Sequence, residues 1–270
     1  MTTPLFFLKL GGSLITNKNI PHQARSDVLK RLADEIARAL TDQPGVRLLL
    51  GHGSGSFGHI PAKKYQTRDG VATFAQWRGL VEVWHEARAL NTIVMEVLHE
   101  SGVHAMAFPP SAQVITSSHK ITHWDTTQIA ACLDNGILPV VYGDVVFDQT
   151  IGGTILSTEE QFEFLAAIFK PARVLLAGIE KGVWMDFPKR KELLDAITPR
   201  NLAMVDPHLE SSESPDVTGG MRSKVHNMMN LVTNLHCQQV LIFSGLDEGN
   251  VFQALTGRKV GTCITLDKKG

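Results

Sequence analysis

The sequence predicts an α/β fold in which helices cover both faces of a mostly parallel sheet. Short apolar runs, typical of buried parallel strands, alternate along the whole chain with segments whose apolar residues recur at helical spacing. Such alternation is typical of strands joined by right-handed helical crossovers. The 270 residues, 43% of them hydrophobic, are enough for one large domain or for two closely joined lobes.

The N-terminal part of the chain predicts a βαβ unit. The first strand is the compact apolar run Leu5–Leu10. A helix follows from Ser26, the expected N-cap, with apolar residues at helical spacing as far as Leu40. Val46–Leu50 is then the second strand, and it leads into a glycine-rich turn, Gly51–His59. Strand, helix and strand in this order form one crossover unit.

The remaining elements follow from the same patterns. One long helix is expected within Val71–Ser101, and its apolar stripe is broad enough to touch two surfaces. Val145–Leu156 is expected to be a hairpin that turns at Ile151–Gly153. Lys170–Pro171 is the expected seam between two lobes, and Glu210–Asp216 is the expected mobile loop. Further strands are expected at 104–108, 138–142, 173–177, 240–243 and 262–266, and further helices at 127–135, 159–169 and 221–235.

Composition excludes several classes of protein. Twenty-six basic and twenty-seven acidic residues leave a net charge of -1, so no global field attracts nucleic acid or anionic lipid. No apolar stretch is long enough to span a membrane. No basic n-region precedes the first apolar run and no cleavage-like site follows it, so we expect no secretory signal. The three scattered cysteines fit neither a disulfide framework nor a metal knuckle. We therefore expect a cytoplasmic protein without a nucleic-acid or membrane partner.

Glycine-rich turns follow the first two predicted strands. Lys9 lies inside the first strand, and Gly11 and Gly12 follow it, where open α/β sheets bind ligands and glycines let backbone N–H groups approach a phosphate. Gly53–Gly58 matches the GxGxxG pattern, but it follows the second strand and leads to a polar loop. A dinucleotide fingerprint is therefore rejected, and no P-loop motif occurs. The turn retains the composition of an oxyanion-binding nest, and His59 at its end is able to donate to a phosphate.

Two further lysines accompany these turns. The turn at 218–220 supplies N–H groups at the start of a predicted helix, close to Lys224. Lys18 lies in a polar segment beyond the first glycine turn and, taken alone, would be read as a solvated surface lysine. Three glycine-rich turns with basic groups indicate several phosphates in a row. Two phosphorylated molecules meeting head to head require such a site.

Two acidic motifs each allow two interpretations. Ser157–Glu160 reads either as an ordinary helix N-cap or as a cap in which Glu159 also holds two lysines apart and in line. Asp144, directly after the apolar run 138–142, is either a turn acid or a polar group on the nucleotide side.

Together these motifs resemble the amino acid kinase superfamily over essentially the whole chain. The extended form LKLGGSLITNK, residues 8–18, with GSGSFGH, residues 53–59, resembles the isopentenyl phosphate kinases within it. The resemblance implies a three-layer αβα sandwich with an open, mostly parallel sheet, usually a homodimer. It implies a single domain with an acceptor lobe at 1–170 and a nucleotide lobe at 171–270. It also implies transfer of the γ-phosphate of Mg-ATP to isopentenyl phosphate, which gives isopentenyl diphosphate for isoprenoid synthesis.

The same resemblance implies roles for individual residues. Ser54 and His59 match contacts to the acceptor phosphate, and Lys18 matches the lysine that stabilises the transition state. The family commonly has Ser-Gly-Asp-Asp where this chain has Ser157–Glu160. Glu159 therefore replaces the carboxylate that organises the lysines, and Thr158 replaces a glycine near the substrate. Positions that match contacts to the ATP phosphates are Lys9, Gly11, Gly12, Gly55, Gly220 and Lys224.

Other readings remain open at this point. Relatives often carry Thr-Asp on the adenine side, whereas this chain reads Ala177–Trp184, so the base pocket is unassigned. No protein ligand is assigned to Mg²⁺, because nucleotide oxygens and water hold it. Fosfomycin kinase shares the pattern of Lys9, Lys18 and His59, and glutamate, acetylglutamate and carbamate kinases share the fold. A non-catalytic nucleotide- or oxyanion-binding protein is a further alternative, although it predicts loss of the lysines, and a dehydrogenase is more distant.

Overall fold

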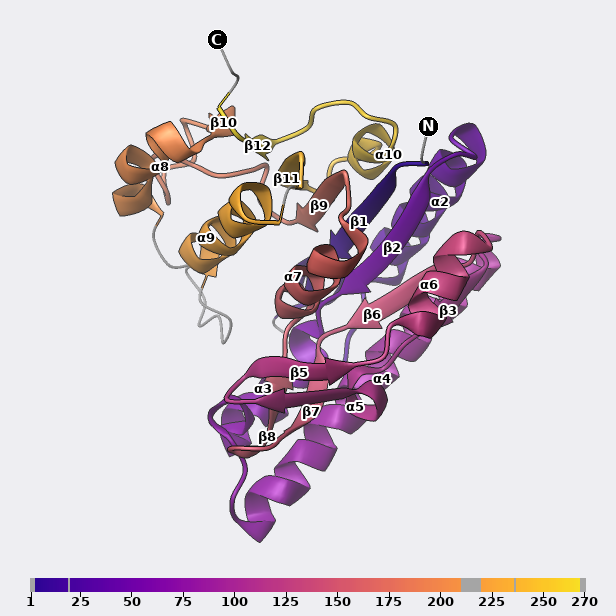
Figure 1. Ribbon diagram of the computed structural model, residues 1–270, viewed down its shortest axis with the longest axis vertical. Helices are drawn as coiled ribbons and strands as arrows, with labels where there is room; N and C mark the ends of the chain where they lie inside the picture. The colour runs from indigo at the N-terminus through magenta and orange to yellow at the C-terminus, as the bar shows by residue number, and fades with distance from the viewer. Residues whose placement is uncertain (1–2, 19, 210–219, 236, 268–270) are drawn as a thin grey trace.

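The computed structural model describes residues 3–18, 20–209, 220–235 and 237–267 (Figure 1). Within them, eight strands form one sheet in the order β10-β12-β11-β9-β1-β2-β6-β3. Every neighbouring pair in it is parallel except β11 and β12. The mostly parallel α/β fold is therefore confirmed. Its strands are β1 (Leu5–Leu10), β2 (Arg47–His52), β3 (Ala105–Ala107), β6 (Leu138–Tyr142), β9 (Arg173–Gly178), β10 (Ala196–Ile197), β11 (Gln239–Ser244) and β12 (Thr262–Ile264).

A second, smaller sheet and the helices complete the described chain. The smaller sheet has the order β5-β4-β7-β8, with β4 (Val114–Ser117), β5 (Lys120–Trp124), β7 (Asp144–Asp148) and β8 (Gly152–Leu156). The helices are α1 (Gly12–Ile15), α2 (Ser26–Asp42), α3 (Gly55–Tyr65), α4 (Phe74–Glu100), α5 (Pro110–Gln113), α6 (Thr127–Asp134), α7 (Thr158–Phe169), α8 (Pro199–Val205), α9 (Gly220–Thr233) and α10 (Asn250–Leu255), with short 3₁₀ turns η1 (Thr67–Asp69) and η2 (Asp206–His208).

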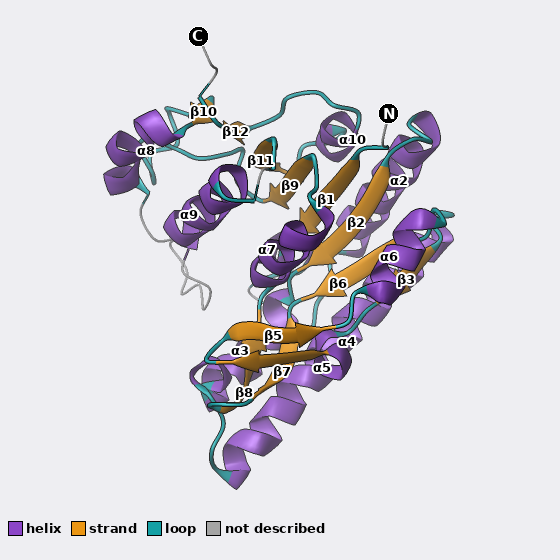
Figure 2. Cartoon of the chain, in the orientation of Figure 1, coloured by secondary structure: helices purple, strands orange, loops and turns teal. Residues whose placement is uncertain are grey.

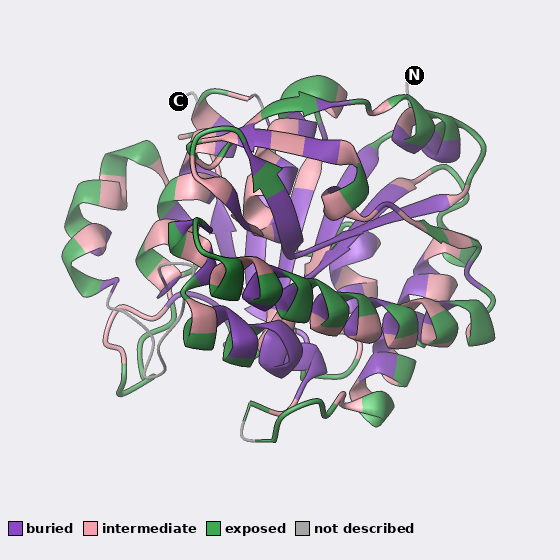
Figure 3. Ribbon diagram, turned by 90° about the horizontal axis from the view of Figure 1, so that it is seen from below, coloured by how far each residue is buried: buried purple, intermediate pink, exposed green. Residues whose placement is uncertain are grey.

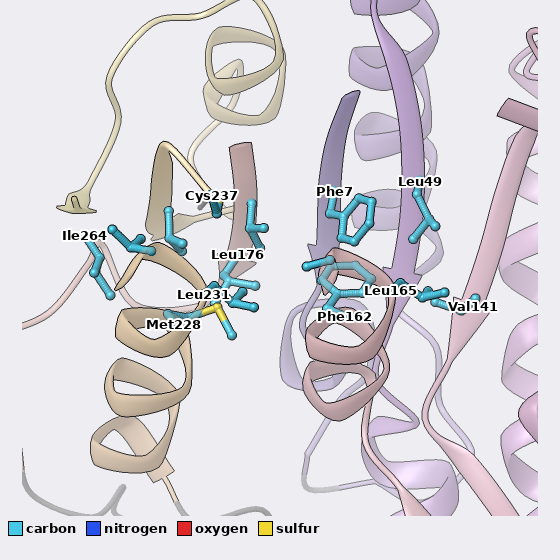
Figure 4. Close-up of a cluster of buried hydrophobic side chains, with 14 of the residues drawn as sticks. Phe7, Leu49, Val141, Phe162, Leu165, Leu176, Met228, Leu231, Cys237 and Ile264 are labelled. Carbon is cyan, nitrogen blue, oxygen red and sulfur yellow. The ribbon is translucent and has the colours of Figure 1, made fainter. Parts of the chain in front are cut away.

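Helices cover both faces of the main sheet (Figure 2). Along β1, side chains alternate between the faces, so Phe6 and Leu8 pack in the core beneath α2 and α4. Phe7 points to the opposite face and packs against Phe162 of α7, with ring centroids 5.1 Å apart (Figure 4). Lys9, two residues after Phe7, belongs to the same face as α7. The strand period thus brings this lysine to the N-terminus of α7.

Helix α4 contacts two surfaces, as its broad apolar stripe predicts. Its C-terminal half contributes Leu90 and Val94 to the core beneath the main sheet. Its N-terminal half contributes Leu80 and Val83 to a separate cluster that includes Val145 of β7. The outer side of this helix stays exposed (Figure 3), and it carries apolar residues that the sequence pattern counted with the core: Val81, 59% exposed, and Trp84, 36% exposed.

Several predicted boundaries need correction. Ser26 is not the N-cap of α2 but its first residue, because Arg25 at the N-cap donates its N–H to the Ile15 carbonyl at 2.8 Å and so determines where the helix begins. The predicted hairpin is present, but Gly152 already pairs with Asp148, so the turn comes earlier in the chain. The turn is moved because the Asp148 carboxylate accepts N–H groups from the two residues before Gly152.

Other elements were missed or cannot be checked. The hairpin β4–β5, helix α8 and the short strand β10 were not predicted, since their short segments show little periodicity. The expected mobile loop 210–216 and residues 217–219 of the third glycine turn lie outside the described residues. No helix in the described part of the chain is both long and apolar enough to cross a membrane.

Candidate active site

A cavity of about 480 Å³ opens at the carboxyl ends of β1, β2 and β9. All the residues to which the sequence analysis gave a catalytic or binding role, within the part of the chain that the structure describes, line this one cavity. The three lysines come from three different kinds of element: a strand, a loop and a helix. The residues concerned are Lys9, Gly11, Gly12, Lys18, Ser54, Gly55, His59, Thr158, Glu159, Gly220 and Lys224.

Glu159, the second residue of α7, forms an ion pair with Lys9. Burial raises the pKa of Glu159, but the positive charges of Lys9 and Lys224 lower it by a larger amount. The pKa of Glu159 therefore lies below the ordinary value. Glu159 is therefore a carboxylate paired with Lys9, and the charge of Lys224 favours its ionised form. Lys224 comes from the second turn of α9, a helix on the same face of the sheet as α7.

The capping interpretation of the same motif is confirmed, through Ser157 and Glu160. Ser157 is the N-cap of α7; its hydroxyl accepts the Glu160 N–H, and the Glu160 carboxylate accepts the Ser157 N–H at 2.7 Å. Arg68 then donates to Glu160 at 2.6 Å and holds it away from Glu159. Adjacent glutamates thus point to different partners, and the role of Glu159 in aligning two lysines stays a prediction.

The two glycine turns that end β1 and β2 pack directly against each other. A β-carbon on Gly12 would lie 2.5 Å from the backbone nitrogen of Gly55, which is too close for any side chain. Gly55 has a φ of 51° and leaves no room beside Thr16. The Thr16 hydroxyl donates to the Gly12 carbonyl at 2.7 Å and accepts the Ser56 N–H at 3.0 Å, which ties the turns together.

The segment read as a long glycine turn ending at His59 is mostly helix. Helix α3 begins at Gly55, Ser54 occupies its N-cap position, and His59 lies one turn inside it on an exposed part of the helix. Two glycines disfavour a helix locally, but burial of Phe57 and the contact with the first glycine turn outweigh that preference. The N-terminus of a helix, rather than a loop, therefore faces the cavity.

Thr158 uses its hydroxyl inside the protein. The hydroxyl donates to the His52 carbonyl at 2.7 Å, and the side chain is buried against the end of β2. The methyl group occupies the space that a β-carbon on Gly51 would need. Thr158 lines the cavity all the same, and the substrate contact predicted for it stays a prediction.

Asp144 is a buried acid at the junction of β6 and β7, and it also lines the cavity. Only 1% of the residue is exposed. Burial raises the pKa of Asp144 to about 6, although its carboxylate accepts the backbone N–H groups of Ser111 and Val145. Position after a buried strand was the sequence signal for this residue, and its burial was not predictable from that position.

Sequence reasoning missed other parts of the cavity wall. Arg68 and His208 line it, and neither lies in a motif. A polar group lies beyond β9: Glu180 accepts hydrogen bonds from the Trp184 indole and from Arg190, both at 2.9 Å. The part of the cavity wall near α3 is apolar, and the apolar stripe of α4 was the only sequence signal for it. The residues of this apolar wall are Ile60, Ala62, Val83 and Ile155.

Comparison with known proteins decides the family. Residues 4–244 match the model of the amino acid kinase family. The isopentenyl phosphate kinase of Methanocaldococcus jannaschii is 33% identical over 266 residues, which cover 96% of this chain and 98% of that relative. The chain belongs to the isopentenyl phosphate kinases of the amino acid kinase family. The resemblance inferred from the motifs is therefore confirmed.

Two further comparisons agree with this kinase family. The isopentenyl phosphate kinase of Methanothermobacter thermautotrophicus is 32% identical over 97% of this chain and 99% of its own length. A solved structure described as an X-ray structure of isopentenyl phosphate kinase superposes with a TM-score of 0.77 at 28% identity, covering 97% of this chain and 100% of that one. As a kinase of the amino acid kinase family, the protein is a phosphotransferase.

Proposed function

We propose that this kinase transfers the γ-phosphate of ATP to isopentenyl phosphate and produces isopentenyl diphosphate. The observation that carries the proposal is the convergence of Lys9, Lys18 and Lys224 on one cavity that also has an apolar wall. Two phosphorylated molecules need the cations, and a five-carbon tail needs the wall. The names of the relatives support the same substrate.

The proposed roles follow the position of each residue around the cavity. Ser54 and His59, at the start of α3, contact the acceptor phosphate, because a helix N-terminus attracts anions. Lys18 stabilises the transferred group, and Glu159 holds Lys9 and Lys224 in place. This division assigns the acceptor to residues 1–170 and the nucleotide to residues 171–270, except that both parts contribute contacts to the ATP phosphates. The proposed contacts to the ATP phosphates are Lys9, Gly11, Gly12, Gly55, Gly220 and Lys224.

The chemistry requires alignment and positive charge. A phosphate monoester has a second pKa of about 6, so the attacking oxygen is already ionised near neutral pH and no general base is needed. Phosphoryl transfer passes through a loose, in-line transition state whose negative charge is spread over the equatorial oxygens. Bringing two anions together is the main obstacle, and the lysines with His59 offset it.

The cavity fits Mg²⁺ that arrives on the nucleotide. Of the three carboxylates in the cavity wall, Glu159 is paired with Lys9 and Glu180 with Arg190, whereas Asp144 is buried and accepts backbone N–H groups. Among the described residues, no group of three or more His, Cys, Asp or Glu side chains forms a metal site. We therefore assign Mg²⁺ to nucleotide oxygens and water, with the nucleotide held by Lys9 and Lys224. When bound, it neutralises charge on the phosphate chain.

The apolar wall favours a prenyl acceptor over a polar one. Ile60 and Ala62 belong to the same helix as His59, and Val83 of α4 and Ile155 of β8 adjoin them in the cavity lining. A phosphate held at the start of α3 would leave its organic tail next to these side chains. Each buried methylene contributes about 0.8 kcal/mol, which a polar acceptor such as glutamate would not gain.

Assembly and location form a second part of the proposal. We propose a homodimer that uses the exposed apolar side of α4, where Phe74, Val81 and Trp84 lie on one stripe. Phe147 of β7 extends this side, and its ring stacks on Trp77. All three cysteines are free and buried, which fits the reducing cytoplasm.

One assay tests the activity. The protein is incubated with ATP and Mg²⁺ and, in parallel, isopentenyl phosphate, dimethylallyl phosphate, fosfomycin, carbamate or glutamate, and products are read by ³¹P NMR. We expect a new diphosphate with the prenyl phosphates alone. Product from fosfomycin, carbamate or glutamate instead would replace the proposal by another small-acid kinase. ATP binding without product from any acceptor would indicate a non-catalytic protein.

A further inference from the structure

A further acidic side chain, Glu180, lies in the wall of the same cavity, on the segment that follows β9. We propose that Glu180 is a positioning residue that holds the Lys18 side chain over the cavity, as Glu159 holds Lys9. The inference rests on the proposed function, because it takes Lys18 as the lysine that stabilises the transferred phosphoryl group. It assigns a role to a segment for which the motifs gave none.

Lys18 needs such a partner more than the other two lysines do. Lys9 lies within a central strand, and Lys224 lies within helix α9. Lys18 belongs instead to an exposed segment whose base is closed by the bridge between Thr16 and Ala24. A lysine on such a segment has many rotamers, and catalysis by alignment is efficient only if one of them is favoured before the substrate arrives.

The position of Glu180 is well defined. Strand β9 pairs with β1 up to Leu10 and Ala177, and the Gly11 N–H donates to the Ala177 carbonyl at 2.8 Å. Glu180 therefore begins its segment beside the glycine turn that leads to Lys18. The Trp184 indole and the Arg190 guanidinium fix the carboxylate by hydrogen bonds of 2.9 Å.

Electrostatics support the pairing. Burial raises the pKa of Glu180, but the hydrogen bonds from Arg190 and Trp184 and the charges of Arg190 and Lys18 together lower it by a larger amount. The pKa of Glu180 therefore lies below the ordinary value. Glu180 is therefore ionised at neutral pH, and it shares the cavity wall with Lys18. Of the three carboxylates that line the cavity, Glu159 pairs with Lys9, and we assign Glu180 to Lys18, while Asp144 is buried against backbone N–H groups. This arrangement limits repulsion between the three ammonium groups and orients them before two anions bind.

A double-mutant cycle tests the inference. Glu180→Gln removes the charge but keeps an oxygen that accepts from Trp184. We expect it to lower kcat about fivefold, as for a partly exposed ion pair, and to change either KM less than about twofold. In a Lys18→Ala background the same substitution should change kcat less than about 1.5-fold, because its effect acts through Lys18. Glu192→Gln, an exposed carboxylate of the same segment, is the matched control and should leave kcat unchanged.

A second measurement does not depend on the acceptor. The rate of reductive methylation of Lys18 is read by peptide mass spectrometry, with Lys9 as internal reference. A neighbouring carboxylate favours the unreactive ammonium form, so Glu180→Gln should raise the Lys18 rate at least about twofold, and Glu192→Gln should not. Equal kcat effects of Glu180→Gln with and without Lys18, or an unchanged methylation rate, would overturn the inference. Failure of the wild-type protein to phosphorylate isopentenyl phosphate would instead overturn the proposed function, and the methylation result would still decide the pairing.

Discussion

Replacement of Asp148 by asparagine is expected to destabilise the lobe that carries the apolar wall. Asp148 ends β7, and only 3% of it is exposed. Its carboxylate joins the turn between β4 and β5 to the turn between β7 and β8. Among the described residues it accepts hydrogen bonds from the Thr116 hydroxyl and from the backbone N–H groups of Ser118, His119, Thr150 and Ile151.

The magnitude follows from the way these donors divide between the two oxygens. Oδ2 accepts from the Thr116 hydroxyl at 2.8 Å and the His119 N–H at 2.9 Å, and the other donors share Oδ1. Asparagine retains one oxygen and turns an NH₂ group toward at least one buried donor. Hydrogen bonds to a charged group contribute about 1.5–3 kcal/mol each, so loss of two predicts about 3–6 kcal/mol of destabilisation at pH 7.

The effect should depend on pH in a definite direction. Burial raises the pKa of Asp148, but the donors lower it much more, so its pKa in the folded protein lies well below the ordinary value. A carboxyl group whose pKa is lowered by folding stabilises the folded state at pH values above its pKa in the unfolded chain, which is about 4. This stabilisation is lost as the pH falls below that value. The difference between wild type and Asp148→Asn should therefore be constant from about pH 5 to 7 and shrink below about pH 4.

Urea unfolding, followed by circular dichroism at several pH values, measures this difference. Asp42→Asn is the matched control, because Asp42 lies on the surface with a single ion-pair contact of 3.8 Å to Arg38. It should change the free energy of unfolding by less than about 0.5 kcal/mol. An Asp148→Asn protein within about 1 kcal/mol of wild type at pH 7, or a difference that grows on acidification, would refute the reasoning.

Three further predictions concern the site. Lys18→Ala should lower kcat about 10²- to 10³-fold with KM changed less than about threefold, because its contact forms mainly in the transition state; equal damage to kcat and acceptor KM would contradict its role. His59→Ala should raise the acceptor KM about tenfold, the loss of one charge-assisted hydrogen bond, and an unchanged KM would remove it from the phosphate site. Gly12→Ala should lower the free energy of unfolding by more than about 2 kcal/mol, since its β-carbon would lie 2.5 Å from the Gly55 nitrogen, whereas Gly45→Ala, with nothing within 4 Å, serves as the control.

Local patterns predicted the framework well. The run at 138–142 is β6, and the long helix expected within 71–101 is α4. These predictions succeed because burial of a strand or of one helix face repeats at a fixed spacing along the sequence. The convergence of the glycine turns was also predictable, because the carboxyl ends of adjacent parallel strands lie at one edge of a sheet.

Pairings between distant residues were not predictable from those patterns. Arg68 meets Glu160, 92 positions away, and nothing near Arg68 in the sequence distinguishes it from a surface arginine. The glycine-rich start of α3 was read as a turn, because its local propensity disfavours the helix that packing against Thr16 and the first glycine turn stabilises.

The amino-acid sequence by itself determined the order of strands and helices, the lysines and glycine turns, and the family to which they belong. The tertiary structure alone decided which carboxylate holds which lysine. Glu159 and Glu160 are neighbours in the chain with the same side chain, yet one pairs with Lys9 and the other with Arg68. The physical reason is that an ion pair depends on the distance between charges in space, which the local periodicity of a sequence does not record.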